Sequence, residues 1–145
     1  MFKNVLIWYY SYMTNWILTP FVMFLFGILP QQYLFTLKAL VNLGAIGGFY
    51  ITYIKPRFIY VDVMNIHLSG TKLRVLDFFT HLLPCLYFNY WLTANNVVFL
   101  SESFSSFFLY GIVYLLVNDP AKLYRINIKD IGIIVVSTLI LTKCI

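Results

Sequence analysis

The chain has 145 residues, of which 61% are hydrophobic and only 10% charged, against about 25% charged residues in typical soluble domains. A water-soluble protein of this length could not bury so much apolar surface, so the composition argues against an ordinary soluble domain. The formal net charge is +5, but the cations stand at the ends of apolar runs, which argues against nucleic-acid binding and favours contact with lipid headgroups.

We therefore predict an all-α fold, a multi-pass α-helical integral membrane protein with one transmembrane domain over residues 1–145. It has five transmembrane helices, or four if the last apolar segment is too short to cross. In chain order, the predicted spans cover residues 5–29, 33–54, 73–93, 97–117 and 126–145, and a polar interfacial loop covers 55–72.

The first span follows an N-terminal cation and has no short apolar region closed by a small-residue cleavage site, so we interpret it as an uncleaved signal anchor. Ser11, Asn15 and Thr19 recur one turn apart and share a helical face that we expect to pack on another helix. Pro20 predicts a kink. The alternative is an interfacial helix to Leu18 followed by a shorter insertion.

The second span, residues 33–54, is the clearest, since at about 1.5 Å per residue its length crosses a hydrocarbon layer of about 30 Å. Its one charged residue, Lys38, is near enough to one end to extend its ammonium group toward water. Gly44 and Gly48 form a G-x-x-x-G pattern with Gly47 beside them, which predicts close helix packing, within the chain in preference to a homodimer.

In the interfacial loop, residues 58–63 have strand-like composition, but a lone strand would leave its backbone unpaired. We therefore expect this stretch to lie on the lipid headgroups.

The third span contains the candidate catalytic residues. Asp77 and His81 are one helical turn apart, so the carboxylate can accept a hydrogen bond from the imidazole and raise its basicity. Cys85, one turn further on, is a candidate nucleophile. The simpler interpretation is that Arg74, Asp77 and His81 form an ionic cluster at headgroup level that anchors the helix without catalysis.

The last two spans are weaker. The fourth needs its serine-rich first turns to be helical in order to cross, and Glu102 is expected at a helix N-terminus. Asp119 and Pro120 then predict the start of a short helix holding Leu123 and Tyr124. The fifth span crosses only if it uses residues 126–130 or if the bilayer thins.

The cations divide unequally between the two sides that five spans would create. One side holds Lys3, Lys55, Arg57, Lys72, Arg74, Lys122, Arg125 and Lys129, and the other holds Lys38 and Lys143. This bias predicts that the N-terminus and the basic loops are cytoplasmic and that the C-terminus lies on the opposite side if there are five spans. The expected headgroup contacts are Lys55, Arg57, Lys72, Arg74, Lys122, Arg125 and Lys129.

For function, our first hypothesis is a non-catalytic structural or assembly component whose helices pack on other membrane proteins or on further copies of itself. The heavy use of Phe, Tyr, Ile, Asn and Lys is typical of AT-rich genomes and suggests a viral or organelle membrane. One alternative is a small membrane-embedded enzyme that acts on lipid, with Asp77 and His81 as acid and base and Cys85 or water as nucleophile. A further alternative is a pore or proton-conducting oligomer. No cofactor, metal site or nucleic-acid partner is expected.

Overall fold

The computed structural model describes residues 12–55, 59–61, 66–68 and 70–145 and is predominantly helical, which confirms the helical class predicted from the sequence. The elements are α2 (Met13–Leu25), η1 (Gln31–Tyr33), α3 (Leu34–Phe49), η2 (Tyr50–Ile54), β1 (Ile59–Val61), β2 (Ile66–Leu68), α4 (Gly70–Asp77), η3 (Phe78–Leu82), α5 (Leu83–Ala94), α6 (Ser105–Val117), α7 (Pro120–Tyr124) and α8 (Ile128–Cys144).

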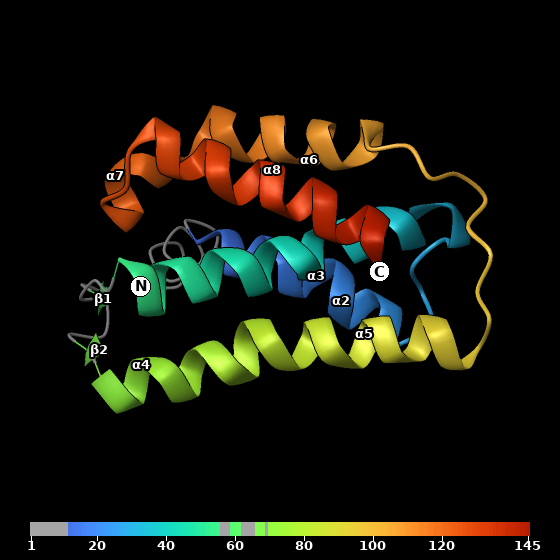
Figure 1. Cartoon of the computed structure of the whole chain (residues 1–145), viewed down its shortest axis with the longest axis horizontal. Coiled ribbons are helices and arrows are strands. Elements are labelled where there is room, and N and C mark those ends of the chain that lie inside the picture. The colour runs from blue at the N-terminus through green and yellow to red at the C-terminus, as the bar shows by residue number, and fades with distance from the viewer. Residues whose placement is uncertain (1–11, 56–58, 62–65, 69) are drawn as a thin grey trace.

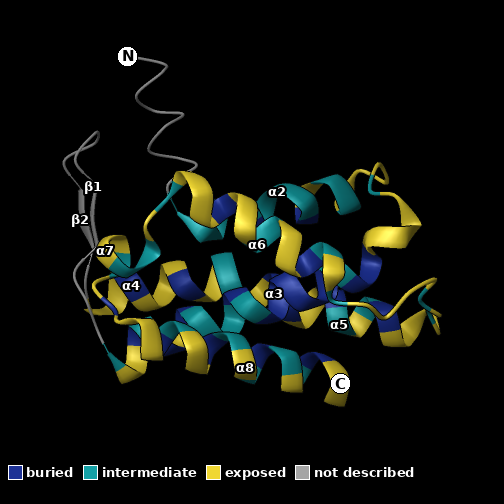
Figure 2. Cartoon of the chain, turned by 90° about the horizontal axis from the view of Figure 1, so that it is seen from above, coloured by how far each residue is buried: buried dark blue, intermediate teal, exposed yellow. Residues whose placement is uncertain are grey.

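The helix α3 occupies the centre of the bundle. Ten of its 16 residues are buried, and it contacts α2, α5, α6, η3 and α8 (Figure 2). Together with η1 and the π-helical turn η2, it forms one helix over Gln31–Ile54. Among the described residues, this is the single helix that is both long enough and apolar enough to cross a membrane by itself. The apolar helices α2 and α6 are shorter.

Successive long helices run in alternating directions along the same axis (Figure 1). The second rod, η1–α3–η2, runs back alongside α2, and α4, η3 and α5 form a third continuous rod over 70–94. The helices α6 and α8 complete the arrangement, with the short α7 between them. As a result, the end of η2, the start of α4, the end of α6 and the start of α8 all lie at the same end of the bundle.

The start of α7 agrees with the prediction from the sequence. The Asp119 side chain accepts a hydrogen bond from the Lys122 amide at 3.2 Å, and Pro120 occupies the first turn. A side-chain oxygen satisfies an amide that has no partner within the helix, and proline has no amide to satisfy there.

The fourth predicted span is wrong in its first turns, because helix α6 begins only at Ser105 and residues 97–104 are not helical. Ser101 Oγ accepts from the Ser103 amide, and Ser103 Oγ accepts from the Ser105 amide, each at 3.2 Å. Such local side-chain bonds compete with helical ones for the backbone. Glu102 consequently does not lie in a helical first turn, and its carboxylate pairs with Lys143 at 3.3 Å.

Contrary to the prediction, Lys38 does not extend its ammonium group to water. Its side chain is 7% exposed, and the ammonium nitrogen lies 5.5 Å from the centre of the Phe99 ring. The non-helical segment before α6 carries Phe99, so that segment covers the lysine with an aromatic face that stabilises a cation.

The interfacial loop also differs from expectation, because β1 and β2 pair as a short antiparallel hairpin with Tyr60 opposite His67. The strand-like stretch therefore has a partner strand that starts seven residues further along the chain, so it is not a lone strand.

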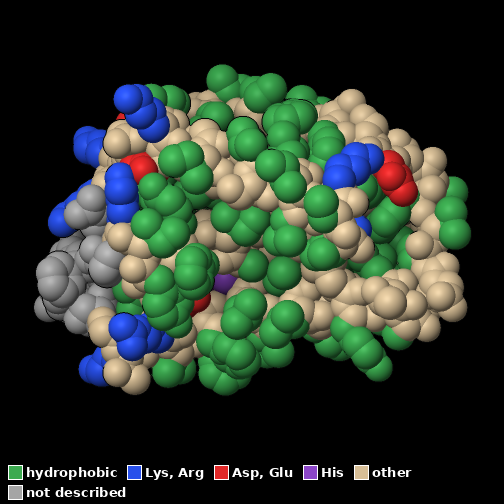
Figure 3. All heavy atoms as spheres, viewed as in Figure 1, with side chains coloured by type: hydrophobic (Ala, Val, Ile, Leu, Met, Phe, Trp, Pro, Cys, Tyr) green, Lys and Arg blue, Asp and Glu red, His purple; other side chains and the backbone are tan. Residues whose placement is uncertain are grey.

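The outer faces of the rods expose many large apolar side chains. We call this surface the apolar belt; it includes Leu86 and Tyr90 on α5, Leu109, Ile112 and Leu116 on α6, and Val136 and Ile140 on α8. Figure 3 shows hydrophobic side chains across the middle of one face, with lysine and arginine gathered mainly at one end. We call that end the cationic end; its exposed residues are Lys72, Arg74, Lys122, Arg125 and Lys129.

Candidate functional site

Asp77 and His81 face each other where α4 passes into η3, a π-helical turn. His81 Nδ1 lies 2.8 Å from Asp77 Oδ1, and the aspartate side chain is buried. The spacing of one turn predicted from the sequence therefore produces a direct contact in the structure. Single π-helical turns within α-helices are frequent at functional sites, because they change the direction of the side chains that follow.

Thr14 of α2 extends this pair into a chain of three side chains. Its Oγ1 lies 2.7 Å from His81 Nε2. The Asp77 carboxylate favours the tautomer with the proton on Nδ1, so Nε2 accepts a hydrogen bond from the Thr14 hydroxyl. The order hydroxyl, imidazole, carboxylate is the arrangement in which a base activates a nucleophile and a carboxylate orients the base. No pattern in the sequence indicated Thr14.

Gly48 makes room for the Asp77–His81 pair. A Cβ atom on this residue would lie 2.1 Å from Asp77 Oδ1 and 2.7 Å from His81 Nδ1. A Cβ atom on Gly44, one turn earlier, would lie 3.4 Å from Ile17 and 3.6 Å from His81. The two glycines of the G-x-x-x-G pattern thus lie where α3 packs closely on η3. A Cβ atom on Gly47 would instead face Ile134 of α8, at 3.7 Å.

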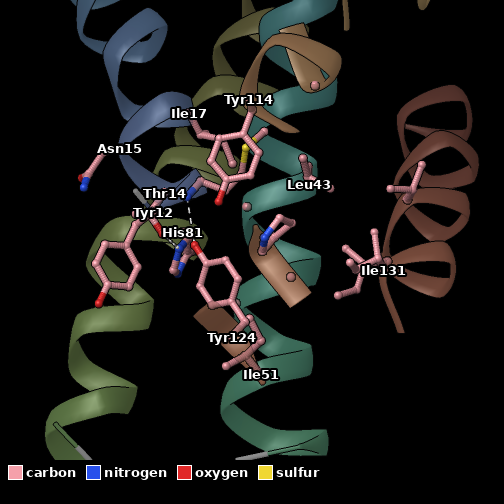
Figure 4. A pocket seen from close by; sticks show the side chains of 18 of the residues that line it. Tyr12, Thr14, Asn15, Ile17, Leu43, Ile51, His81, Tyr114, Tyr124 and Ile131 are labelled. Carbon is pink, nitrogen blue, oxygen red and sulfur yellow. Dashed lines mark hydrogen bonds between the residues drawn. The ribbon is translucent and has the colours of Figure 1, made fainter. Parts of the chain in front are cut away.

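A cavity of about 510 Å³ adjoins the three side chains. Its walls come from α2, α3, η2, α4, η3, α6, α7 and α8, and they are almost entirely apolar. In Figure 4, Thr14, His81 and Tyr124 are turned toward one another among apolar neighbours that include Ile17 and Leu43. The polar atoms are therefore concentrated at one part of an apolar space, the usual composition of a small-molecule site.

Tyr124, at the end of α7, adds a further hydroxyl to this polar part. Its Oη accepts a hydrogen bond from the Met13 amide at 2.9 Å, and Thr14 and Tyr114 are also within hydrogen-bond reach. Burial raises the pKa of the Tyr124 phenol to about 12, so the side chain is neutral at physiological pH and can still donate a hydrogen bond. The sequence predicted the helix that carries this residue but not its position at the cavity.

Cys85 lies apart from the cavity, although it shares a helix face with Asp77 and His81. Its thiol is buried and lies 3.2 Å from Asn42 Oδ1, to which it donates. Asn42 also accepts from Asn89 Nδ2 at 2.9 Å and donates to Thr142 at 3.1 Å, so it connects α3 with α5 and α8. The structure therefore places Cys85 in a buried polar network, away from Thr14 and His81.

The expected ionic anchor at Arg74 has a different partner. Its guanidinium lies 5.5 Å from the centre of the Tyr53 ring, and the Asp77 carboxylate instead contacts His81. Of the seven predicted headgroup contacts, Arg57 falls outside the described residues and Lys55 is half-buried in an ion pair, 2.7 Å from Asp130. The other five are the exposed residues of the cationic end.

The face predicted from Ser11, Asn15 and Thr19 is described only in part, because Ser11 lies outside the described residues. Thr19 Oγ1 donates to the Asn15 carbonyl at 2.8 Å, so this hydroxyl is satisfied within its own helix. The face therefore gives less support to a polar pore lining than its sequence pattern did.

Among the described residues, no group of three or more His, Cys, Asp or Glu side chains is placed to hold a metal ion. No protein-family model, curated protein or solved structure matches this chain.

Proposed function

We propose that this chain is a multi-pass integral membrane protein that acts as a non-catalytic structural or assembly component. Five helical segments would cross the bilayer, with the cationic end in the cytoplasm. The observation that carries the proposal is the apolar belt. Single exposed apolar side chains are normal on soluble proteins, but so many large apolar side chains exposed on neighbouring helices need either lipid or protein to cover them.

The charge distribution supports the proposed orientation. All five exposed cations of the cationic end project from one end of the bundle, where α4 and α8 begin and α6 ends. Each such cation near an anionic leaflet contributes about 1 kcal/mol of attraction. At the other end, Lys143 is already paired with Glu102.

Helix length is the main constraint on this proposal. With 13 residues, α6 extends only about 20 Å, less than a hydrocarbon core of about 30 Å. The preceding segment 97–104 would have to lie at the membrane interface, and the bilayer would have to thin locally around α6 and α8.

The two native cysteines test the orientation. We expect a membrane-impermeant maleimide to label the exposed Cys144 in sealed, right-side-out vesicles, because α8 would end on the outer side. Buried Cys85 is the internal control and should react only after denaturation. A Lys72→Cys variant, at the opposite end of the bundle, should react only after the vesicles are opened. Labelling of Cys144 only in opened vesicles would contradict the five-span arrangement.

The structural or assembly role is tested by gentle solubilisation of the native membrane followed by purification of the chain. We expect other membrane proteins, or further copies of this chain, in stoichiometric amounts. A chain that purifies as a monomer under these conditions would count against the assembly role but not against membrane residence.

A second candidate function, a small membrane-embedded enzyme acting on lipid, is favoured by one specific observation. Asp77, His81 and Thr14 converge on an apolar cavity. In this candidate, His81 is the general base, Asp77 orients it, and the Thr14 hydroxyl or a water molecule is the nucleophile.

We expect His81→Ala to lower any lipid turnover by the reconstituted protein by about 10²–10⁴-fold, the usual contribution of a general base. Cys85→Ala should retain the activity, because the thiol lies outside the cavity. Products are measured by mass spectrometry of vesicle lipids. If the wild-type chain releases no product from mixed phospholipids, the first candidate alone stands.

A further inference from the structure

We propose that the cavity binds one lipid acyl chain, with the carbonyl group of that chain against Thr14, His81 and Tyr124. This inference rests on the proposed location in a membrane, and it names the part of a lipid that the second candidate function would recognise. The carbonyl could belong to a protonated fatty acid or to an ester of a phospholipid, since both present a neutral carbonyl oxygen to the site.

The shape and composition of the cavity fit a hydrocarbon chain. A volume of about 510 Å³ falls within the range of roughly 300–1,000 Å³ for small-molecule sites. Its walls include Ile17, Leu43, Ile131 and Ile134 from three different helices. A sugar or nucleotide in this space would lose its hydrogen bonds to water without replacement, whereas a hydrocarbon chain has none to lose.

The cavity opens toward the apolar belt. Four of its lining residues are also exposed at the outer surface: Leu76 on α4 at 40%, and Phe108, Ile112 and Leu115 on α6 at 45%, 54% and 55%. Figure 3 shows apolar side chains on both sides of a hollow in the middle of one face. An opening with an apolar rim lets a ligand enter sideways from the hydrocarbon layer, which is the route a lipid tail would take.

The polar part of the cavity determines the direction in which the acyl chain binds. The Tyr124 hydroxyl is neutral and can donate to a carbonyl oxygen, and the Thr14 hydroxyl is close to it. His81 holds Thr14 in place through a bond of 2.7 Å, and Asp77 holds His81. Because Asp77 and His81 satisfy each other, the carbonyl of an ester, or of a fatty acid in its protonated form, fits beside them without bringing a further charge into an apolar space.

Two glycines provide a matched pair of variants for a test. Gly111 on α6 lines the cavity, and Gly132 on α8 is exposed and is not among the residues that line it. A Cβ atom at either position meets nothing within 4 Å. Gly111→Leu therefore fills part of the cavity, while Gly132→Leu makes the same chemical change in a helix at the outer surface.

The experiment uses the full chain in vesicles that contain a fatty acid or a phosphatidylcholine with a photoreactive diazirine in its tail. Cross-linked positions are mapped by mass spectrometry. We expect both the cavity walls and the apolar belt to be labelled, and Gly111→Leu to lower labelling of the walls about tenfold while Gly132→Leu leaves it unchanged. Labelling by the fatty acid alone identifies a free acid as ligand; labelling by the phospholipid identifies an ester.

Tyr124→Phe is the second variant, because it removes the hydroxyl that can donate to the carbonyl while keeping the shape of the ring. It should reduce wall labelling by the two carbonyl-bearing probes and leave labelling by a diazirine alkane unchanged. Wall labelling that neither variant alters, or cross-links confined to the apolar belt, would overturn the acyl-chain site.

Alkaline extraction of the same vesicles separates this result from the proposed membrane residence. If the chain stays in the membrane and only its apolar belt is labelled, the proposed location stands and the acyl-chain site is wrong. If the chain is extracted but still carries probe on its cavity walls, the acyl-chain site stands and the proposed membrane location is wrong.

Discussion

Replacing Gly48 with alanine is expected to destabilise the protein by roughly 1–3 kcal/mol or more, the usual cost of inserting a methyl group where no space exists. The new Cβ would lie 2.1 Å from Asp77 Oδ1, so either α3 and α4 must separate or the carboxylate must leave His81. Moving the carboxylate away from His81 would cost further stability, because a buried carboxylate would lose its hydrogen-bond partner. Thermal unfolding of the purified protein in mild detergent measures the loss.

The neighbouring glycine provides the control. At Gly47 the new methyl group would be 3.7 Å from Ile134, an ordinary contact, and alanine also favours the helix. Gly47→Ala should therefore leave the melting temperature unchanged or raise it slightly. The double variant Gly48→Ala with Asp77→Ala should lose less stability than the two single variants added together. Equal effects of Gly47→Ala and Gly48→Ala would show that α3 is not closely packed on the Asp77–His81 pair.

The Gly48 contact shows how much of the site could be predicted from the sequence. The G-x-x-x-G pattern predicted a close approach to another helix, and the i, i+4 spacing predicted the contact between Asp77 and His81. Both are local patterns, in which the geometry of a single helix determines which side chains share a face. The sequence could not show that the two patterns meet, because which helix packs on which face depends on the whole bundle.

The same limit explains why the sequence did not indicate Thr14 or Tyr124 as site residues. Thr14 and His81 are 67 positions apart, and Met13 and Tyr124 are 111 apart, so no spacing rule connects them. The helical class and the start of α7 depended on composition and on local capping, and they were predicted correctly. The start of α6 depended on serine side chains that bind the backbone, and the apolar pattern alone gave the wrong boundary.

Asp130 was missed as well, although a local signal was present. Asn127 and Asp130 form a capping box, in which each side chain accepts a hydrogen bond from the backbone amide of the other at 2.9 Å. An Asn-x-x-Asp sequence before an apolar run is a variant of the usual N-terminal pattern and predicts a helix start. The sequence could not show the rest of its contacts, because the Asp130 carboxylate also accepts from Lys55 and Tyr50, at the opposite end of the central rod from Gln31.

We therefore expect Asp130→Ala to be among the most destabilising single substitutions, with a loss of about 2–3 kcal/mol. This value is below the cost of breaking a fully buried pair, because Lys55 is 35% exposed and can turn toward water. The loss has three sources: the lost ion pair between Lys55 and Asp130, a Tyr50 hydroxyl without this acceptor, and an α8 N-terminus without half of its capping box.

Two further variants separate these sources, with unfolding followed in the same detergent. Asn127→Ala removes the cap while leaving the ion pair, and it should cost about 1 kcal/mol. Asp130→Asn keeps an acceptor for Tyr50 and removes the charge, so its effect should fall between those of Asn127→Ala and Asp130→Ala. If Asp130→Ala costs no more than Asn127→Ala, the contact with Lys55 and Tyr50 does not hold α3 and α8 together, and the capping box alone accounts for the aspartate.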